Sequence, residues 1–266
     1  MDLKRTLDRV KSAVAEAGAE ILEIYSNPDR FETEHKEDHS PLTAADLAAN
    51  RILVARLQEL TPGIPILSEE SKQAPWHDRK HWERCWVVDP LDGTKEFLKR
   101  NDEFTVNVAL VRDHQPILGV VYAPALQKWY YAARHEGAWR QEGSGVMDRI
   151  RVAEKPAGRP WKVVGSRSHN TAEVDAFVAA LGEAELVSMG SSLKLCLVAD
   201  GTADVYPRLG PTSEWDTCAA QAIVEQAGGQ VLNAETGEPL RYNARESVLN
   251  PHFIACASPD PLWFKS

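Results

Sequence analysis

The stretch CWVVDPLDGTKEF, residues 85–97, contains the strongest indication of the fold in this sequence. It begins with an apolar run typical of a buried strand, and its Asp-Pro and Asp-Gly steps then predict a tight turn. Asp89 and Asp92 flank this turn, so both carboxylates are expected at one strand end, where they can point at a shared metal ion. Pro90 restricts the backbone, Gly93 permits a close turn, and a backbone carbonyl would add a hard oxygen ligand suited to Mg²⁺. Taken alone, these residues are better explained as an ordinary acidic turn.

Two further acidic segments stand at the ends of predicted elements. Ser68-Glu69-Glu70 follows the short apolar run 64–67, and Glu214-Trp215-Asp216-Thr217 begins a helical pattern. A structural helix cap would by itself explain the second segment. Together with the turn after residue 88, these carboxylates form the inventory that a two-metal phosphoryl-transfer site requires.

Apolar periodicity predicts a first half in which two helices flank a mostly antiparallel sheet. Apolar residues recur at three- and four-residue steps from Leu3 to Ile24, which predicts one helix, and Thr43 is expected to cap a second. The charged segment 31–42 between them is expected to be an exposed loop. Strands are predicted at 64–67, 85–89, 104–111, 116–124, 128–134 and 137–140.

The Pro- and Gly-rich segment 153–160 is the predicted domain boundary. It divides the chain into an N-terminal α+β domain, 1–155, with the metal site, and a C-terminal α/β domain, 156–266, which completes the substrate pocket. In the second domain strands and helices alternate. Strands are predicted at 161–166, 185–189, 203–208, 229–233 and 253–258, and helices at 171–181, 191–200 and 215–227.

The composition is that of a globular protein with excess negative charge. The 266 residues are 43% hydrophobic, and 30 Lys+Arg against 39 Asp+Glu give a net charge of −9. This charge excludes binding of a nucleic acid polymer by general electrostatics and argues against a nuclease. No apolar run is long enough for a transmembrane segment, and the N-terminus lacks the apolar core of a signal peptide.

The four cysteines are isolated from one another and have apolar or small neighbours, which favours reduced, buried thiols in a cytoplasmic protein. The chain is therefore expected in the cytoplasm. Peripheral association with the inner membrane, and a homodimer formed through an exposed strand edge, stay open.

The segments SEE (68–70), WVVDPLDGTKEF (86–97) and EWDTCAA (214–220) together resemble the lithium-sensitive, Mg²⁺-dependent phosphatases of the inositol monophosphatase superfamily. The segments GSSLKLCLVADG (190–201) and YPRLGPTSEWDT (206–217) are similar to its branch of bacterial 3'(2'),5'-bisphosphate nucleotidases. This resemblance implies a layered αβαβα sandwich, the sugar-phosphatase fold of mixed α+β and α/β class, with two to three Mg²⁺ ions in the site.

The resemblance also implies a role for individual residues. The metal ligands would be Glu69, Asp89, Asp92, Asp216 and the carbonyl of Leu91. Asp46 and Thr94 would activate the attacking water, and Glu69 would contribute to catalysis through a third, weakly held ion. The substrate contacts would be Gly93, Thr94, His169, Ser191, Lys194, Arg208 and Asp216.

The function implied is hydrolysis of the 3'-phosphate of adenosine 3',5'-bisphosphate to give AMP and phosphate, with the sulfated analogue as a second substrate. The attack would use metal-activated water, without a phosphoenzyme. The same chemistry on inositol monophosphate or fructose 1,6-bisphosphate is the alternative, and Lys95-Glu96-Phe97 with SSLK (191–194) favours the nucleotidase. A non-catalytic regulator that binds a phosphorylated ligand is a third interpretation.

Overall fold

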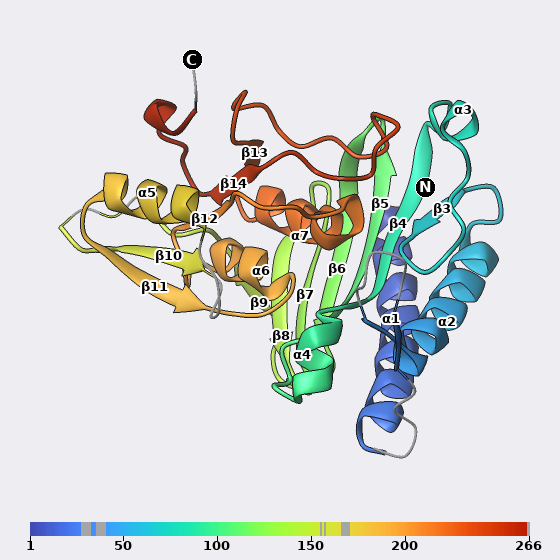
Figure 1. Cartoon of the computed structure of the whole chain (residues 1–266). Helices are drawn as coiled ribbons and strands as arrows, with labels where there is room; N and C mark the ends of the chain where they lie inside the picture. The colour runs from blue at the N-terminus through green and yellow to red at the C-terminus, as the bar shows by residue number, and fades with distance from the viewer. Residues whose placement is uncertain (28–32, 36–40, 155, 157, 166–170, 265–266) are drawn as a thin grey trace.

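The protein is described by a computed structural model that covers residues 1–27, 33–35, 41–154, 156, 158–165 and 171–264. Helices and sheets alternate in five layers, which Figure 1 shows from the α1–α2 pair on one side to α5 on the other. The predicted layered sandwich is therefore confirmed.

The larger sheet has seven strands in the order β3-β4-β5-β6-β7-β8-β9. The strands are β3 (Ile66–Ser68), β4 (Arg84–Asp92), β5 (Thr105–Arg112), β6 (Gln115–Ala123), β7 (Lys128–Ala133), β8 (Gly137–Glu142) and β9 (Asp148–Ile150). Only β3 and β4 are parallel, and the other neighbouring pairs are antiparallel, as predicted. Strand β9 was not predicted, because Ile150 is its single apolar residue.

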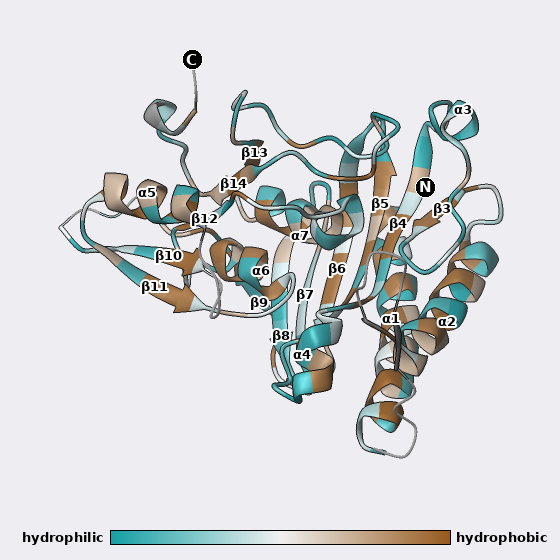
Figure 2. Cartoon of the chain, in the orientation of Figure 1, coloured by the Kyte–Doolittle hydropathy of each residue, from teal (hydrophilic) through white to brown (hydrophobic). Residues whose placement is uncertain are grey.

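Helices α1 (Leu3–Tyr25) and α2 (Ala44–Leu60) cover one face of this sheet. The alternation along β4 explains why: Trp86 and Val88 face these helices, whereas Cys85 and Val87 belong to the core on the opposite face. Figure 2 shows the resulting hydrophobic segments along the central strands. Both faces of the sheet are thus buried, so polar side chains can gather at the ends of its strands.

The expectation of an exposed loop over residues 31–42 is wrong in part. Strand β1 (Thr33–His35) pairs antiparallel with β2 (Pro41–Thr43), and residues 31–32 and 36–40 lie outside the described part. The polar segment lacks the apolar alternation by which strands are recognised. Residue Thr43 then caps α2, as predicted.

The second sheet has five strands in the order β11-β10-β12-β14-β13, and it is mixed. The strands are β10 (Trp161–Gly165), β11 (Ala184–Ser188), β12 (Val205–Arg208), β13 (Gln230–Asn233) and β14 (Phe253–Cys256). Helices α6 (Leu193–Ala199) and α7 (Glu214–Gln226) pack between the two sheets, and α5 (Ala172–Leu181) covers the outer face.

Helix α7 lies unusually close to the larger sheet. A Cβ atom built on Gly119 of β6 would lie 2.1 Å from the carbonyl oxygen of Ala219. Only glycine leaves room for this approach. This close packing fixes the distance between the end of β4 and the first turn of α7, which carries Asp216.

The short helices are α3 (Trp76–Arg79), α4 (Thr94–Lys99) and the 3₁₀ turn Pro261–Trp263. The predicted division between residues 155 and 156 falls between β9 and β10. Lys155 itself lies outside the described residues, and the division into two domains stays a prediction. The four cysteines are buried and free, as expected. Within the described ranges, no helix is both long and apolar enough to cross a membrane.

Candidate metal and phosphate site

Three carboxylates from two distant parts of the chain meet at the carboxyl end of β4. One oxygen each of Asp89, Asp92 and Asp216 lies within 4.8 Å of the other two. Asp89 and Asp92 flank the irregularity at the end of β4, and Asp216 lies in the first turn of α7. The predicted meeting of the DPLDGT turn with the EWDT segment is therefore present in the structure.

Their mutual repulsion favours neutralisation by bound protons or by a cation. Asp89 is 1% exposed, and desolvation together with the neighbouring charges of Glu69, Asp92 and Asp216 raises its pKa well above the usual range. Desolvation and the charge of Asp92 raise the pKa of Asp216 to about 7. Buried carboxylates that repel one another are costly to fold without a counter-charge. An oxygen-only donor set of this kind fits hard divalent cations such as Mg²⁺.

The remaining two predicted metal ligands lie beside this cluster. The backbone N–H of Glu69 donates to the carbonyl of Val88, which continues the β3–β4 pairing, and the Glu69 carboxylate raises the pKa of Asp89. The backbone N–H of Leu91 donates to Asp89 Oδ1 at 3.1 Å and so fixes that carboxylate against the turn.

Asp46 and Thr94 are in contact, as the resemblance implied. The Thr94 hydroxyl lies 3.3 Å from Asp46 Oδ1 and 3.4 Å from the carbonyl oxygen of Leu91. The other Asp46 oxygen, Oδ2, accepts from the backbone N–H of Thr43 at 2.7 Å, which forms the capping box of α2. The two Asp46 oxygens therefore have separate partners, because Oδ2 caps α2 while Oδ1 faces the Thr94 hydroxyl.

Gly93 provides the turn that brings Thr94 to this position. Its φ of +90° lies in the left-handed region, and Gly93 is the N-cap of α4. A Cβ there would meet the carbonyl oxygen of Glu103 and the Ser191 side chain, both at 3.3 Å. A side chain at this position would be both strained and crowded, which accounts for the glycine.

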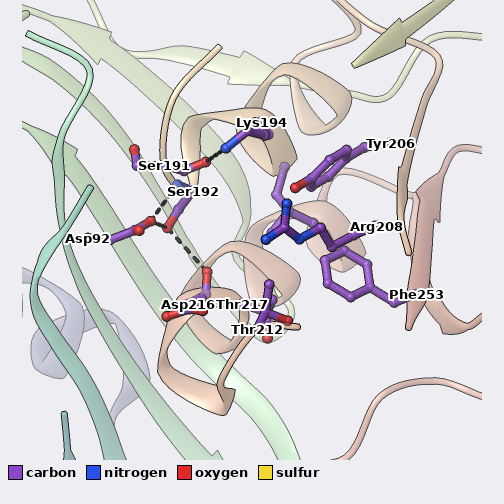
Figure 3. A pocket seen from close by; sticks show the side chains of 11 residues that line it. Asp92, Ser191, Ser192, Lys194, Tyr206, Arg208, Thr212, Asp216, Thr217 and Phe253 are labelled. Carbon is purple, nitrogen blue, oxygen red and sulfur yellow. Dashed lines mark hydrogen bonds between the residues drawn. The ribbon is translucent and has the colours of Figure 1, made fainter. Parts of the chain in front are cut away.

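A cavity adjoins the carboxylates and is lined by cationic and aromatic side chains (Figure 3). Its lining residues are Asp92, Ser191, Ser192, Lys194, Leu195, Tyr206, Arg208, Thr212, Asp216, Thr217 and Phe253. Figure 3 shows Lys194, Tyr206 and Arg208 across the cavity from Asp92 and Asp216. The cavity thus has an anionic wall and a cationic wall.

The cationic wall is held by local contacts. Arg208 ends β12, its Nη2 donates to the carbonyl of Pro211 at 3.0 Å, and its Nε is buried without a hydrogen-bond partner. Lys194 Nζ lies 3.3 Å from the carbonyl of Ser191, at the start of α6. An unpaired buried donor beside a cavity is a group that a ligand oxygen would satisfy. His169 lies outside the described residues, so its predicted contact has no structural counterpart here.

Sequence reasoning missed some of the residues that shape this site. Ser192 donates to Asp92 Oδ2 from its backbone N–H at 2.6 Å and from its hydroxyl at 2.5 Å. Tyr206 and Phe253 form an aromatic wall, with ring centroids 5.7 Å apart. Serine at a helix start is an ordinary capping residue, and aromatic residues in strands are ordinary core residues. No pattern in the sequence distinguishes Ser192, Tyr206 and Phe253 from other capping serines and buried aromatic residues of this chain.

Comparison with known proteins assigns residues 2–259 to the inositol monophosphatase family. The 3'(2'),5'-bisphosphate nucleotidase CysQ of Salmonella typhimurium is 50% identical over 247 residues, which are 93% of this chain and 98% of that protein. The enzyme of the same name from Escherichia coli K12 is 49% identical with the same coverage. The crystal structure of CysQ from Bacteroides thetaiotaomicron superposes with a TM-score of 0.86 at 44% identity, covering 97% of this chain and 99% of that one.

Proposed function

The chain belongs to the inositol monophosphatase family, and we propose that it is a Mg²⁺-dependent 3'(2'),5'-bisphosphate nucleotidase. It hydrolyses the 3'-phosphate of adenosine 3',5'-bisphosphate to AMP and phosphate, and it accepts the sulfated analogue. Relatives that carry this name match nearly the whole chain at about half identity. The four buried free thiols fit action in the cytoplasm, a reducing compartment.

The observation that carries this proposal is the two-walled cavity beside the carboxylate cluster. A substrate with two phosphates needs one anion-binding group at the reacting phosphate and another at the distant one. Asp92 and Asp216 lie on the first wall, and Lys194 and Arg208 lie on the second. A monophosphate such as inositol 1-phosphate leaves the second wall unused, which is why the geometry favours a bisphosphate.

The first wall would hold divalent cations through Asp89, Asp92, Asp216, Glu69 and the Leu91 carbonyl. When bound, such cations lower the pKa of water and neutralise the charge that develops on the phosphoryl oxygens. We assign Mg²⁺ because carboxylate and carbonyl oxygens are its preferred protein ligands.

Within the protein, Thr94 and Asp46 orient the attacking water. Thr94 Oγ1 accepts a hydrogen bond from the water while its own proton points at Asp46 Oδ1, 3.3 Å away. The Thr43 backbone N–H holds the Asp46 carboxylate in this orientation. A proton leaving the water therefore has a path to a carboxylate whose position is fixed by the helix cap.

Lys194 and Arg208 orient the substrate through its second phosphate. Both side chains bind anions by charge-assisted hydrogen bonds, and Arg208 has an unpaired Nε available. The aromatic wall of Tyr206 and Phe253 closes the same cavity. When the second phosphate is fixed, the reacting 3'-phosphate is placed against the carboxylate wall. This positioning lowers the entropic cost of reaching the transition state.

The proposal is tested by phosphate release, measured side by side from adenosine 3',5'-bisphosphate, inositol 1-phosphate and fructose 1,6-bisphosphate. We expect a clear preference for the nucleotide with Mg²⁺ and no release when a chelator is added. Preference for inositol 1-phosphate would retain the metal site and refute the assignment of the second wall. Preference for fructose 1,6-bisphosphate would retain both walls and refute the nucleotide as the substrate. Absence of release from all three would refute the catalytic proposal.

A further inference from the structure

Ser192 links the metal-ligand wall to the segment that opens α6. Its hydroxyl accepts a hydrogen bond from Asn107 Nδ2 at 2.6 Å and donates to Asp92 Oδ2 at 2.5 Å. Its backbone N–H donates to the same Asp92 oxygen at 2.6 Å. Ser192 is 3% exposed and Asn107 is 1% exposed, so water does not replace these bonds.

This arrangement fixes one oxygen of Asp92. Oδ2 receives two hydrogen bonds, both from Ser192. Because Oδ2 is held by these bonds, rotation of the carboxylate is restricted, and one Asp92 oxygen lies within 4.8 Å of an oxygen of Asp89 and of an oxygen of Asp216. Hydrogen bonds to a metal-binding carboxylate fix the ligand's orientation before the metal arrives.

The direction of the Asn107–Ser192–Asp92 chain is determined by its donors. Asn107 Nδ2 can only donate, so the Ser192 hydroxyl must accept there and has one proton left to give. The Asp92 carboxylate at 2.5 Å is the stronger acceptor, and the carbonyl of Asp216 lies at 3.2 Å. Asn107 stands opposite Asp89 in the β4–β5 register, so the chain begins on the same sheet that carries the metal ligands.

The same serine belongs to the segment that forms the start of the cationic wall. Gly190 and Ser191 precede it, and the Gly190 N–H donates to Glu103 Oε2 at 2.7 Å. A Cβ on Gly190 would lie 2.8 Å from the Glu103 carbonyl oxygen, and Ser191 has a φ of +43°. The segment 190–192 is therefore attached to β4 at Asp92, to β5 at Asn107, and to Glu103 just before β5.

We propose that Ser192 is a positioning residue that orients Asp92 for metal binding and ties the position of the 190–194 segment to the metal ligands. This inference rests on the metal site of the proposed function. Loss of the Ser192 hydroxyl leaves one hydrogen bond on Asp92 Oδ2, from the backbone, and leaves Asn107 Nδ2 without its acceptor. Loss of such a supporting contact typically weakens metal affinity about 10- to 100-fold.

The test compares Ser192→Ala with Ser191→Ala in the full-length protein. The Ser191 hydroxyl accepts from Thr105 Oγ1 at 3.4 Å and does not bond to Asp92, so its variant is the matched control. Mg²⁺ is titrated calorimetrically into each chelator-stripped protein, and kcat and KM for adenosine 3',5'-bisphosphate are measured across Mg²⁺ concentrations. We expect Ser192→Ala to bind Mg²⁺ about 10- to 100-fold more weakly, with most of kcat regained at saturating Mg²⁺.

The Ser191→Ala control is expected to keep its Mg²⁺ affinity within about twofold of wild type. Its KM for the nucleotide is expected to rise. Equal Mg²⁺ affinity of Ser192→Ala and wild type would overturn the inference, and so would equal weakening by both variants. Thermal unfolding in chelator shows whether each variant is folded. Asn107→Ala, which removes the donor to Ser192, is the second variant and is expected to weaken Mg²⁺ binding in the same direction by less.

The inference and the proposed function fail in different ways. If wild-type protein binds no Mg²⁺ and releases no phosphate, the proposed function itself is refuted. If wild type does both and Ser192→Ala binds Mg²⁺ equally well, only the role of Ser192 is refuted.

Discussion

Replacement of Gly119 by alanine tests how the larger sheet positions the metal ligands. The new Cβ would lie 2.1 Å from the Ala219 carbonyl oxygen and 2.9 Å from the Ala222 Cβ, both on α7. A contact below 3.0 Å is not tolerated, so α7 and β6 must separate by close to 1 Å, from 2.1 Å to at least 3.0 Å. Helix α7 carries Asp216, and its displacement opens the carboxylate cluster.

The expected magnitude follows from two opposing effects. An alanine in a strand ordinarily stabilises by ~0.5–1 kcal/mol relative to glycine. Forcing an extra methyl group into a packed interior costs about 1–3 kcal/mol. The clash is with backbone atoms, which cannot rotate away, so we expect net destabilisation and a Tm lower by roughly 2–4 °C per kcal/mol. A displacement of this size near reacting groups costs about 10²-fold in turnover.

The assay combines thermal unfolding, Mg²⁺ titration and phosphate release for Gly119→Ala. Gly63→Ala is the matched control, because a Cβ on Gly63 would meet no atom within 4 Å. The control is expected to match wild type in all three measurements. A Gly119→Ala protein that is as stable as wild type and binds Mg²⁺ equally well would refute the argument that this contact positions Asp216.

Four further predictions concern the site itself. Asp92→Asn should abolish measurable phosphate release. The chelated variant should be at least as heat-stable as wild type, because the substitution removes a charge that raises the pKa values of Asp89 and Asp216. A loss of folding, measured by circular dichroism, would contradict this. Thr94→Ala should lower kcat about 10²- to 10⁴-fold with Mg²⁺ affinity retained, and unchanged kcat would exclude Thr94 from water activation. Lys194→Ala should lower kcat/KM for the nucleotide about 10- to 100-fold, and less for a small phosphomonoester; equal losses on both would argue against a specificity role. The Tm of chelated protein should fall between about pH 5 and pH 8, because the raised pKa values of Asp89 and Asp216 give the folded state more bound protons than the unfolded state. Mg²⁺ should therefore raise the Tm more at pH 8 than at pH 5, and a pH-independent effect of Mg²⁺ would contradict the assignment of these carboxylates.

Most strands and long helices were predictable, because burial leaves a periodic pattern in the chain. The run 104–111 is apolar except for Thr105 and Asn107, and it forms most of β5, which is buried on both faces. Short elements lack such a pattern: α4 spans six residues after the DPLDG turn, and β9 has one apolar residue. Their positions depend on contacts with other elements, which local sequence does not express.

The candidate site was predictable in chemistry and only partly in geometry. The spacing of Asp89 and Asp92 showed that they share a strand end, but Asp216 joins them only because α7 packs against β6 at Gly119. The contact of Ser192 with Asp92 likewise joins residues 100 positions apart in the chain. Chain spacing describes neighbours along one element and carries no information on which elements meet.

The measurement that tests the central claim most directly is ³¹P NMR of adenosine 3',5'-bisphosphate during incubation with the protein and Mg²⁺. The account predicts that the 3'-phosphate resonance disappears, inorganic phosphate appears in equal amount, and the 5'-phosphate of AMP is retained. Chelation of the metal should stop the reaction. Release of the 5'-phosphate, or an unchanged spectrum with Mg²⁺ present, would contradict a two-walled site in which the carboxylates face the 3'-phosphate and Lys194 and Arg208 hold the other.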